Sequence, residues 1–184
     1  MTGSRREQIL DRAAELFASR GFHGVSVHDV GAACGISGPA LYRHFASKDA
    51  MLGEMLVGIS ERLLREARSR LRGGPKPAEA LAALIDWHVD FALRHRSLIV
   101  VQDRDWDSLP ADARARVRRL QRAYIDLWVD QLGRLEPRLQ RDEAAARVRA
   151  VFGLLNSTPR SGRLPDGDLR PLLTSMGWAA LRAA

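Results

Sequence analysis

Three side chains that can bond to a nucleic acid follow one another at Tyr42, Arg43 and His44. A phenol hydroxyl can donate a hydrogen bond to a phosphate, and an arginine can bond to a phosphate or to the edge of a guanine. Leu41 and Phe45 flank them four positions apart, a spacing that places both on one face of a helix. The pattern predicts a short helix that is anchored by its apolar face and presents the other face to DNA.

The segment before this helix carries the signals of another short helix and a tight turn. Ser26 and Asp29 form a capping box, and the helix that they open is expected to stop at Gly35. Ser37 is placed to cap the next helix, and Pro39 fits its first turn because no amide hydrogen is needed there. Residues 26–45 therefore predict a helix-turn-helix, whose second helix would enter the major groove.

The residues predicted to contact double-stranded DNA lie on the outer side of this motif or at helix N-termini, where free amides favour phosphate. They are Ser26, His28, Ser37, Gly38, Pro39, Ala40, Tyr42, Arg43, His44 and Lys48. Such a helix pair can also be plain packing without any nucleic-acid function. Charge does not separate the two interpretations, because the net charge is +7 but residues 1–48 hold six basic against four acidic residues.

The run from Ser26 to Lys48 resembles the signature of the TetR family of bacterial transcriptional regulators, and the likeness extends over residues 5–55. The chain departs from it at Gly38 and Pro39, where the family often has lysine and glycine. The resemblance implies a helix-turn-helix DNA-binding domain at residues 1–48 and a helical ligand-binding and dimerisation domain at residues 49–184. It also implies that the helix at about 48–71 links the two, and that Lys48 couples movement of the body to the head.

The whole chain is typical of an all-α protein with about nine helices. Beyond the motif and a first helix at residues 5–20, apolar periodicity and Pro and Gly breaks indicate helices at 48–71, 77–95, 97–102, 111–135, 141–157 and 168–183. The run Leu98 to Val101 could be a strand, but it has no partner strand and is better interpreted as a buried short helix.

Large side chains recur in the predicted body at positions that could line a ligand pocket. They are Trp87, His88, Phe91, His95, Trp106, Tyr124, Trp128 and Phe152. Aromatic residues at helical spacing are as often plain core, so the two interpretations stand side by side. His88 and His95 are seven positions apart, a poor spacing for a shared metal ion, and no metal site is predicted.

Apolar stripes on the last two predicted helices indicate a homodimer, because two helices from each subunit can form a four-helix interface. The interface residues predicted from these stripes are Val148, Val151, Phe152, Leu155, Leu169, Leu172, Leu173 and Met176. A dimer also suits recognition of a palindromic operator, since one short helix contacts too few base pairs.

The effector expected from the sequence is a small molecule, either an acyl coenzyme A ester or another small hydrophobic compound. The arginines at positions 104, 116, 118, 119 and 122 could meet an anionic ligand, although such residues usually form a solvated face. The run from Phe152 to Pro159 resembles the regulators of acyl coenzyme A breakdown within the TetR family.

Other classes of protein find little support. The single cysteine, Cys34, excludes an internal disulfide, and no long apolar run or leader is present, so a cytoplasmic protein without membrane contact is expected. Asp103, Asp105 and Asp107 alternate without the glycine and distal glutamate of a calcium loop, and no catalytic motif or cofactor site is found. The sequence therefore predicts a ligand-released repressor, with an activator or a ligand-independent DNA binder as alternatives.

Overall fold

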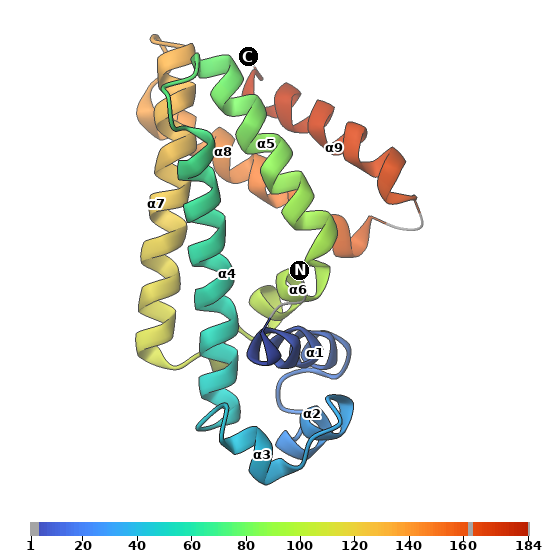
Figure 1. Cartoon of the computed structure of the whole chain (residues 1–184). Coiled ribbons are helices and arrows are strands. Elements are labelled where there is room, and N and C mark those ends of the chain that lie inside the picture. Colours follow the sequence, from blue (N-terminus) through green and yellow to red (C-terminus); the bar gives the residue numbers. More distant parts are fainter. Residues whose placement is uncertain (1–3, 162–163, 184) are drawn as a thin grey trace. The chain divides into compact units, whose positions relative to one another are not determined.

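The computed structural model describes residues 4–161 and 164–183, and within these ranges the chain is helical without strands (Figure 1). The α-helices are α1 (Arg5–Arg20), α2 (Val27–Ala33), α3 (Gly38–Tyr42), α4 (Lys48–Arg70), α5 (Pro77–Arg94), α6 (Arg96–Arg104), α7 (Ala111–Leu135), α8 (Arg141–Leu155) and α9 (Asp166–Leu181). Two single-turn 3-10 helices, η1 (Trp106–Ser108) and η2 (Thr158–Arg160), follow α6 and α8. The predicted all-α fold is confirmed.

Most helix boundaries lie within two residues of those predicted, and the exceptions have local causes. The run Leu98 to Val101 is helical, as part of α6. Helix α3 ends at Tyr42 rather than at Phe45, because the chain turns there toward α4, although the Phe45 amide still donates to the Leu41 carbonyl at 3.0 Å. None of the helices in the described ranges is long and apolar enough to cross a bilayer.

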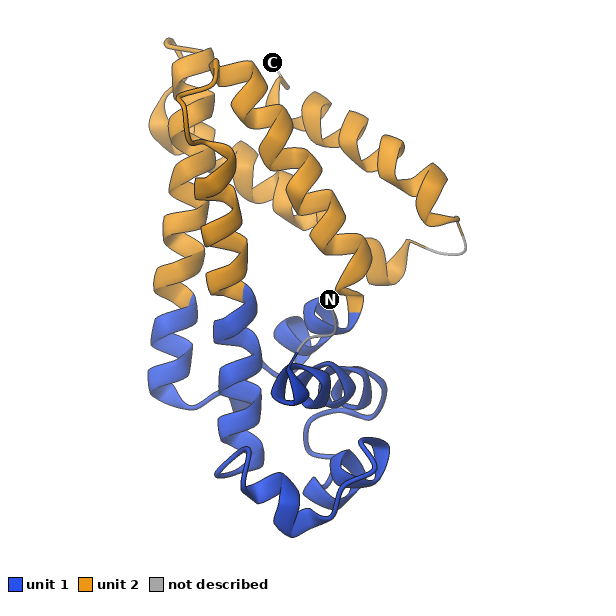
Figure 2. Cartoon of the chain, in the orientation of Figure 1, with its two compact units in different colours: residues 1–59, 97–117 blue, residues 60–96, 118–184 orange. Residues whose placement is uncertain are grey.

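The chain forms two compact units (Figure 2). Unit 1 comprises Met1–Ile59 and Ser97–Val117, and unit 2 comprises Ser60–Arg96 and Arg118–Ala184. This division differs from the predicted boundary after residue 48, because the first turns of α4 pack with α1 to α3 and because residues 97–117 fold with them. Helices α4 and α7 therefore each contribute residues to both units.

Each unit has its own apolar core. In unit 1 the core is built around Ile9 and Phe17 of α1, Leu41 of α3 and Leu52 of α4, all buried. In unit 2 it is built around Leu84 of α5, Trp128 of α7 and Val148 of α8. The predicted effector-site residue Trp106 packs with the core of unit 1, whereas the other predicted aromatic residues belong to unit 2.

The apolar stripes of α8 and α9 face the chain's own interior, which corrects the predicted dimer interface. Five of its eight residues are buried in the core of unit 2, namely Val148, Val151, Leu155, Leu169 and Leu173. Helices α5, α8 and α9 meet at Gly177, where an added Cβ would lie 3.5 Å from Leu155 and 3.7 Å from Ile85. Leu172 and Met176 lie on the opposite side of α9 and are exposed.

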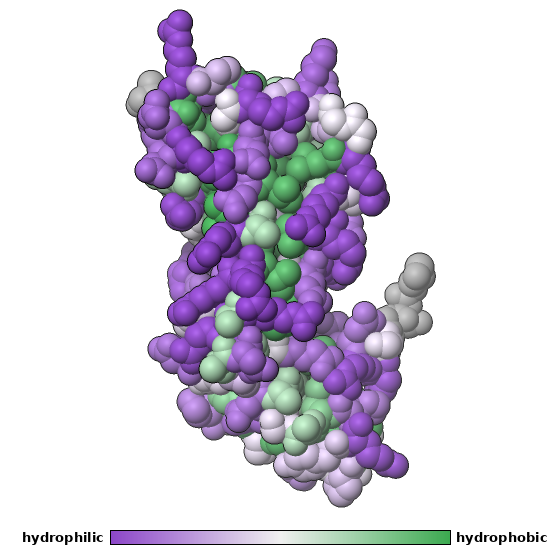
Figure 3. Space-filling model, turned by 90° about the vertical axis from the view of Figure 1, so that its left-hand side faces the viewer, coloured by the Kyte–Doolittle hydropathy of each residue, from purple (hydrophilic) through white to green (hydrophobic). Residues whose placement is uncertain are grey.

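Unit 2 carries exposed arginines. Arg118, Arg119 and Arg122 of α7 are exposed, as the solvated-face interpretation predicts, and hydrophilic side chains cover most of the face shown in Figure 3. The positive charge is therefore not concentrated on the helix-turn-helix.

Candidate nucleic-acid interface and aromatic core

The turn between α2 and α3 is set by local hydrogen bonds and by two glycines. Ser26 accepts from the Asp29 amide at 3.1 Å, and the Asp29 carboxylate accepts from the Ser26 amide at 2.8 Å, which confirms the capping box. Gly35 has φ of +66°, a conformation that side chains disfavour. A Cβ on Gly31 would lie 2.9 Å from the Ile36 carbonyl oxygen, so the turn can fold closely over α2 only with glycine there.

Helix α3 is anchored by its apolar face and leaves its polar face free. Leu41 and Phe45 are buried in unit 1. Tyr42 is 56% exposed, and Arg43 beside it is exposed as well. The exposed part of an aromatic ring is unfavourable in water and adds nothing to the core. The position of Tyr42 at the tip of the motif therefore favours contact with a partner.

The other residues predicted to contact DNA differ in their exposure and in their hydrogen bonds within the chain. His28, Ser37 and Pro39 are exposed, and Gly38, Ala40 and His44 are half-buried. The hydroxyls of the two serines serve as helix caps, because Ser26 bonds to Asp29 and Ser37 accepts from the Ala40 amide at 3.3 Å. A phosphate contact through either serine would compete with its cap.

Lys48 has a structural position that differs from the predicted phosphate contact. Its ammonium donates to the carbonyl of Phe22 at 2.8 Å and to that of Val25 at 2.9 Å, and it lies 4.3 Å from the centre of the Phe22 ring. The first residue of α4 is thereby tied to the loop that leads into α2. Lys48 thus positions the motif within unit 1.

Replacing Lys48 by methionine is expected to lower the free energy of unfolding by about 2 kcal/mol, because two partly buried carbonyls lose a charged donor. The salt dependence of operator binding should stay unchanged, whereas loss of a phosphate contact would reduce the slope of log K against log salt by about one for each contact. Urea denaturation and titrations at several salt concentrations measure both quantities. Lys76→Met, at the other lysine of the chain, is the control. A slope that falls in K48M but not in K76M would show that Lys48 contacts a phosphate after all.

Arg6 of α1 holds the end of α3 from the other side, a contact that no sequence pattern predicts. Its guanidinium forms two hydrogen bonds to the Glu54 carboxylate and one to the His44 carbonyl, and it lies 4.3 Å from the centre of the Phe45 ring. Because Glu54 is on α4, Arg6 joins three helices at the base of the motif.

Arg104 and Asp105 at the end of α6 hold the other end of α1. Arg104 donates to the carbonyls of Phe17 and Ala18 in the last turn of α1 and to the carboxylate of Asp105, and the Phe17 carbonyl also accepts from the Gly21 amide at 2.8 Å. Buried Asp105 in turn accepts from the Phe22 amide at 3.4 Å. The loop between α1 and α2 is therefore fixed by α6 as well as by Lys48.

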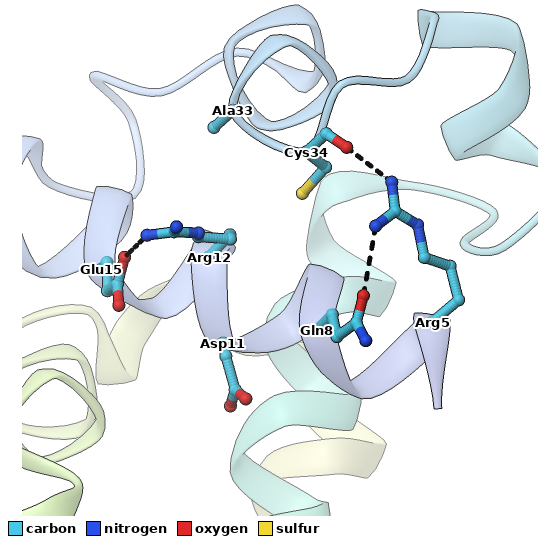
Figure 4. Close-up of a pocket in the computed structure, with 7 residues that line it drawn as sticks. All are labelled: Arg5, Gln8, Asp11, Arg12, Glu15, Ala33 and Cys34. Carbon is cyan, nitrogen blue, oxygen red and sulfur yellow. Dashed lines mark hydrogen bonds and ion pairs between the residues drawn. The ribbon is translucent and has the colours of Figure 1, made fainter. Parts of the chain in front are cut away.

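A polar hollow of about 420 Å³ lies between α1 and the end of α2 (Figure 4). Arg5 crosses it to the Cys34 carbonyl at 2.5 Å, and Arg12 pairs with Glu15 at 2.8 Å. Burial raises the pKa of the half-buried Cys34 thiol above its ordinary value, so the thiol is neutral. The bond from Arg5 therefore fastens the end of α2 to α1, whereas Arg12 and Glu15 pair within α1.

The aromatic residues of unit 2 gather around His88 on α5. Its Nδ1 lies 3.2 Å from the Tyr124 hydroxyl, and its Nε2 lies 3.0 Å from Asn156 Oδ1. The Phe152 ring stacks on His88 with centroids 4.8 Å apart and meets Trp128 edge-on at 5.0 Å. A neutral imidazole satisfies both bonds, with Nε2–H donating to Asn156 and Nδ1 accepting from Tyr124.

Five of the eight predicted aromatic-site residues form this group, namely His88, Phe91, Tyr124, Trp128 and Phe152. His95 contacts this group through Phe91, at 5.4 Å between ring centres. Trp87 stacks under Arg70 and donates to the Leu63 carbonyl, so it packs against α4. Asn156 belongs to the site but was not predicted, although it lies in the run from Phe152 to Pro159 that the sequence singled out.

Burial makes the stability of unit 2 depend on pH through His88, because it lowers the pKa of this imidazole to about 4. An unfolded histidine has a pKa of about 6.5, so between pH 6.5 and 4 the unfolded chain binds a proton that the folded chain does not. The free energy of unfolding is therefore expected to fall by about 3 kcal/mol as pH decreases through this window. In urea titrations at several pH values, His88→Gln should remove that dependence and His28→Gln, at an exposed histidine, should retain it.

Comparison with known proteins agrees with this architecture. Residues 9–55 match the family described as bacterial regulatory proteins, tetR family. Residues 74–161 match the tetracyclin repressor-like C-terminal domain. The chain belongs to the TetR family. The first match contains α2 and α3, and the second contains α5, α6, α7 and α8, so both the helix-turn-helix and the aromatic core lie in segments typical of TetR-family regulators.

Individual relatives share the fold over nearly the whole chain. The transcriptional repressor KstR2 of Mycobacterium tuberculosis is 30% identical over 130 residues, which cover 70% of this chain and 65% of KstR2, slightly under two thirds of its length. The KstR2 structure matches with a TM-score of 0.80 at 25% identity over 98% of this chain and 95% of that one. PfmR from Thermus thermophilus matches with a TM-score of 0.85 at 25% identity, covering 100% and 98%. AibR, solved with isovaleryl coenzyme A and operator DNA, matches at 0.76 and 21% identity, covering 94% and 97%.

Proposed function

We propose that this TetR-family protein is a transcriptional repressor that binds an operator as a dimer and is released by a small molecule. The observation that carries the proposal is the tip of α3, where Tyr42 and Arg43 are exposed while Leu41 and Phe45 are buried. A short helix held in this way can insert its polar face into a major groove. The likeness to the repressor KstR2 supports the same role.

The proposed dimer uses the outer faces of α8 and α9 instead of the stripes that pack inward. On α9, Leu172 is 46% and Met176 44% exposed, and Ala179 continues the same face. On α8, Ala150 and Gly153 are exposed. Exposed large apolar side chains beside small residues allow close helix packing, and the two helices from each copy would form a four-helix interface.

Replacing Leu172 and Met176 together by glutamate is expected to convert the dimer into a monomer, because four like charges would face one another across a two-fold axis. Light scattering after size exclusion gives the mass directly. Leu164→Glu is the matched control, since this leucine is 42% exposed but precedes α9. A double variant that remains dimeric would show that the two copies meet elsewhere.

Release by an effector would follow from a shift between two conformations of the body. Helix α4 begins at Lys48, which holds the loop before α2, and ends among residues of unit 2. A ligand that binds better to a conformation in which α4 has moved would therefore weaken DNA binding. We propose a small hydrophobic effector. The alternative that the effector is an acyl coenzyme A ester rests on the run from Phe152 to Pro159, because 21% identity to AibR supports only a common fold.

Footprinting on the promoter of the protein's own gene tests the proposal. Protection of a palindromic site by the dimer, with loss of protection on adding a metabolite or an acyl coenzyme A ester, is the expected result. Protection with transcription increased in a reconstituted assay would favour an activator, and protection that no compound relieves would favour a ligand-independent binder. A chain that binds random DNA as tightly as the promoter would exclude operator recognition.

A further inference from the structure

The indole nitrogen of Trp128 is the one unsatisfied polar atom that we find in the described aromatic core. Trp128 is fully buried, and its Nε1 makes no hydrogen bond of ordinary geometry with the described part of the chain. It lies close enough to the Tyr124 hydroxyl to lower the pKa of that phenol, but burial has the larger effect and raises it. A buried N–H without an acceptor costs about 1 to 3 kcal/mol. An oxygen atom from outside the chain would remove that cost.

The groups around Trp128 carry no net charge. His88 is neutral because burial lowers its pKa to about 4, and the raised pKa of Tyr124 keeps that phenol protonated. Arg70 acts on Tyr124 from a distance, but it is stacked 4.5 Å over Trp87 and paired with Glu66 at 3.4 Å. A charged ligand group would have no counter-ion here, so its desolvation would be unfavourable.

The rings also select for shape. His88, Tyr124 and Phe152 are nearly parallel, with interplanar angles of 22° between the first two and 9° between the last two. Phe152 is half-buried, whereas His88, Tyr124 and Trp128 are buried. Because Phe152 stacks on both His88 and Tyr124, rotation of its side chain would expose a flat surface made by these two rings, with Trp128 nearly perpendicular beside it.

We propose that this aromatic core binds an uncharged, flat, apolar molecule whose carbonyl or hydroxyl oxygen accepts a hydrogen bond from Trp128 Nε1. The molecule takes the place of the Phe152 ring and stacks on His88 and Tyr124. Asn156 is half-buried, bonds to His88 and follows Phe152 by one helical turn, so it offers a second polar group beside the proposed ligand. This inference rests on the proposed function, because it names the class of effector; a coenzyme A moiety, with its phosphates, would find no cation in the core.

The test uses the full chain and three probes: 9-fluorenone, a flat ketone; fluorene, the same rings without the oxygen; and octanoyl coenzyme A. Isothermal titration calorimetry gives affinities without DNA, and fluorescence anisotropy of labelled promoter DNA reports release. Fluorenone is expected to bind about tenfold more tightly than fluorene, which is the usual effect of one buried hydrogen bond. Fluorenone, but not octanoyl coenzyme A, is expected to release the DNA.

Trp128→Phe removes the donor and keeps an aromatic ring. It should weaken fluorenone binding about tenfold while leaving fluorene binding unchanged. Trp178→Phe, on half-buried Trp178 under Arg182, is the control and should change neither. Should the Trp128 variant fail to fold, Phe152→Ala provides the second test, because removing the displaced ring is expected to strengthen fluorenone binding severalfold.

Any of four results would overturn the inference. These are equal affinities for fluorenone and fluorene, no binding of either, an equal effect of W128F on both, and binding of octanoyl coenzyme A alone. These outcomes are distinct from failure of the proposed function. If the chain bound fluorenone through Trp128 but did not bind its promoter, the ligand site would be supported and the repressor function refuted. If it bound the operator but none of the probes, the repressor function would be supported and the ligand site refuted.

Discussion

Replacing Tyr42 by alanine is expected to weaken operator binding about 30- to 150-fold while leaving the dimer and its stability intact. One lost hydrogen bond to phosphate, with the packing around it, is worth about 1 to 1.5 kcal/mol, and a two-fold symmetric dimer loses it twice. Stability should change little, because Tyr42 is 56% exposed. Arg43→Ala should have an effect at least as large, since its guanidinium can contact phosphate or guanine.

Anisotropy titrations with promoter DNA at several salt concentrations distinguish what each side chain contacts. Loss of a phosphate contact weakens binding to all sequences and reduces the salt slope, whereas loss of a base contact relaxes discrimination at one position. Arg122→Ala removes the same charge from an exposed site in unit 2 and is the control for general electrostatics. Full retention of affinity by both Y42A and R43A would refute the assignment of α3 as the recognition helix.

The helix-turn-helix could be predicted from the sequence because its determinants are local. Ser26 and Asp29 cap the same helix, and Leu41 and Phe45 are one turn apart, so the pattern and the structure depend on the same short segments. The parts that hold the motif could not be predicted in this way. Arg6 reaches the carbonyl of His44, 38 positions away, and Arg104 reaches that of Phe17, 87 positions away. No periodicity links residues at such separations.

The apolar stripes of α8 and α9 show a second limit. Their spacing indicates correctly that one face of each helix is buried. Burial against a second copy of the chain and burial against another helix of the same chain require the same spacing, so the pattern does not distinguish them. Only the packing of α5 against both helices, with Gly177 at the meeting point, shows that Val151 and Leu155 are internal. Leu172 and Met176 belong to the predicted interface because of the same periodicity, and their exposure distinguishes them from its buried members.

The aromatic residues of the body show the same ambiguity at a finer scale. Trp87 and His88 are neighbours in sequence, yet one stacks under Arg70 and the other joins Tyr124 and Asn156. A helix turns by about 100° per residue, so adjacent side chains meet different partners. The sequence could therefore supply the set of candidates, but the fold alone selected five of them and added Asn156.

Replacing Arg104 by methionine is expected to lower the free energy of unfolding by about 2 kcal/mol and to weaken operator binding at least tenfold. Methionine keeps much of the length of the side chain but leaves Asp105, 7% exposed, without its cation and removes the guanidinium bonds to the carbonyls of Phe17 and Ala18. Removing one member of a buried pair costs about 3 to 5 kcal/mol, and the value expected here is smaller because Arg104 is 43% exposed. Denaturation in urea and promoter titrations measure the two effects.

The effect on binding has a different origin from that of Tyr42, since Arg104 is expected to act only through position. The bond from the Phe22 amide to Asp105 then no longer ties the loop to an arginine that also holds the end of α1, so α3 is expected to be held less firmly before it meets DNA. Affinity should then fall without change in the salt slope or in base preference, and Arg104→Lys should restore part of it by returning the charge. If R104M lost stability but bound the operator normally, Lys48 and Arg6 alone would be enough to hold the recognition helix, and α6 would have no part in presenting it.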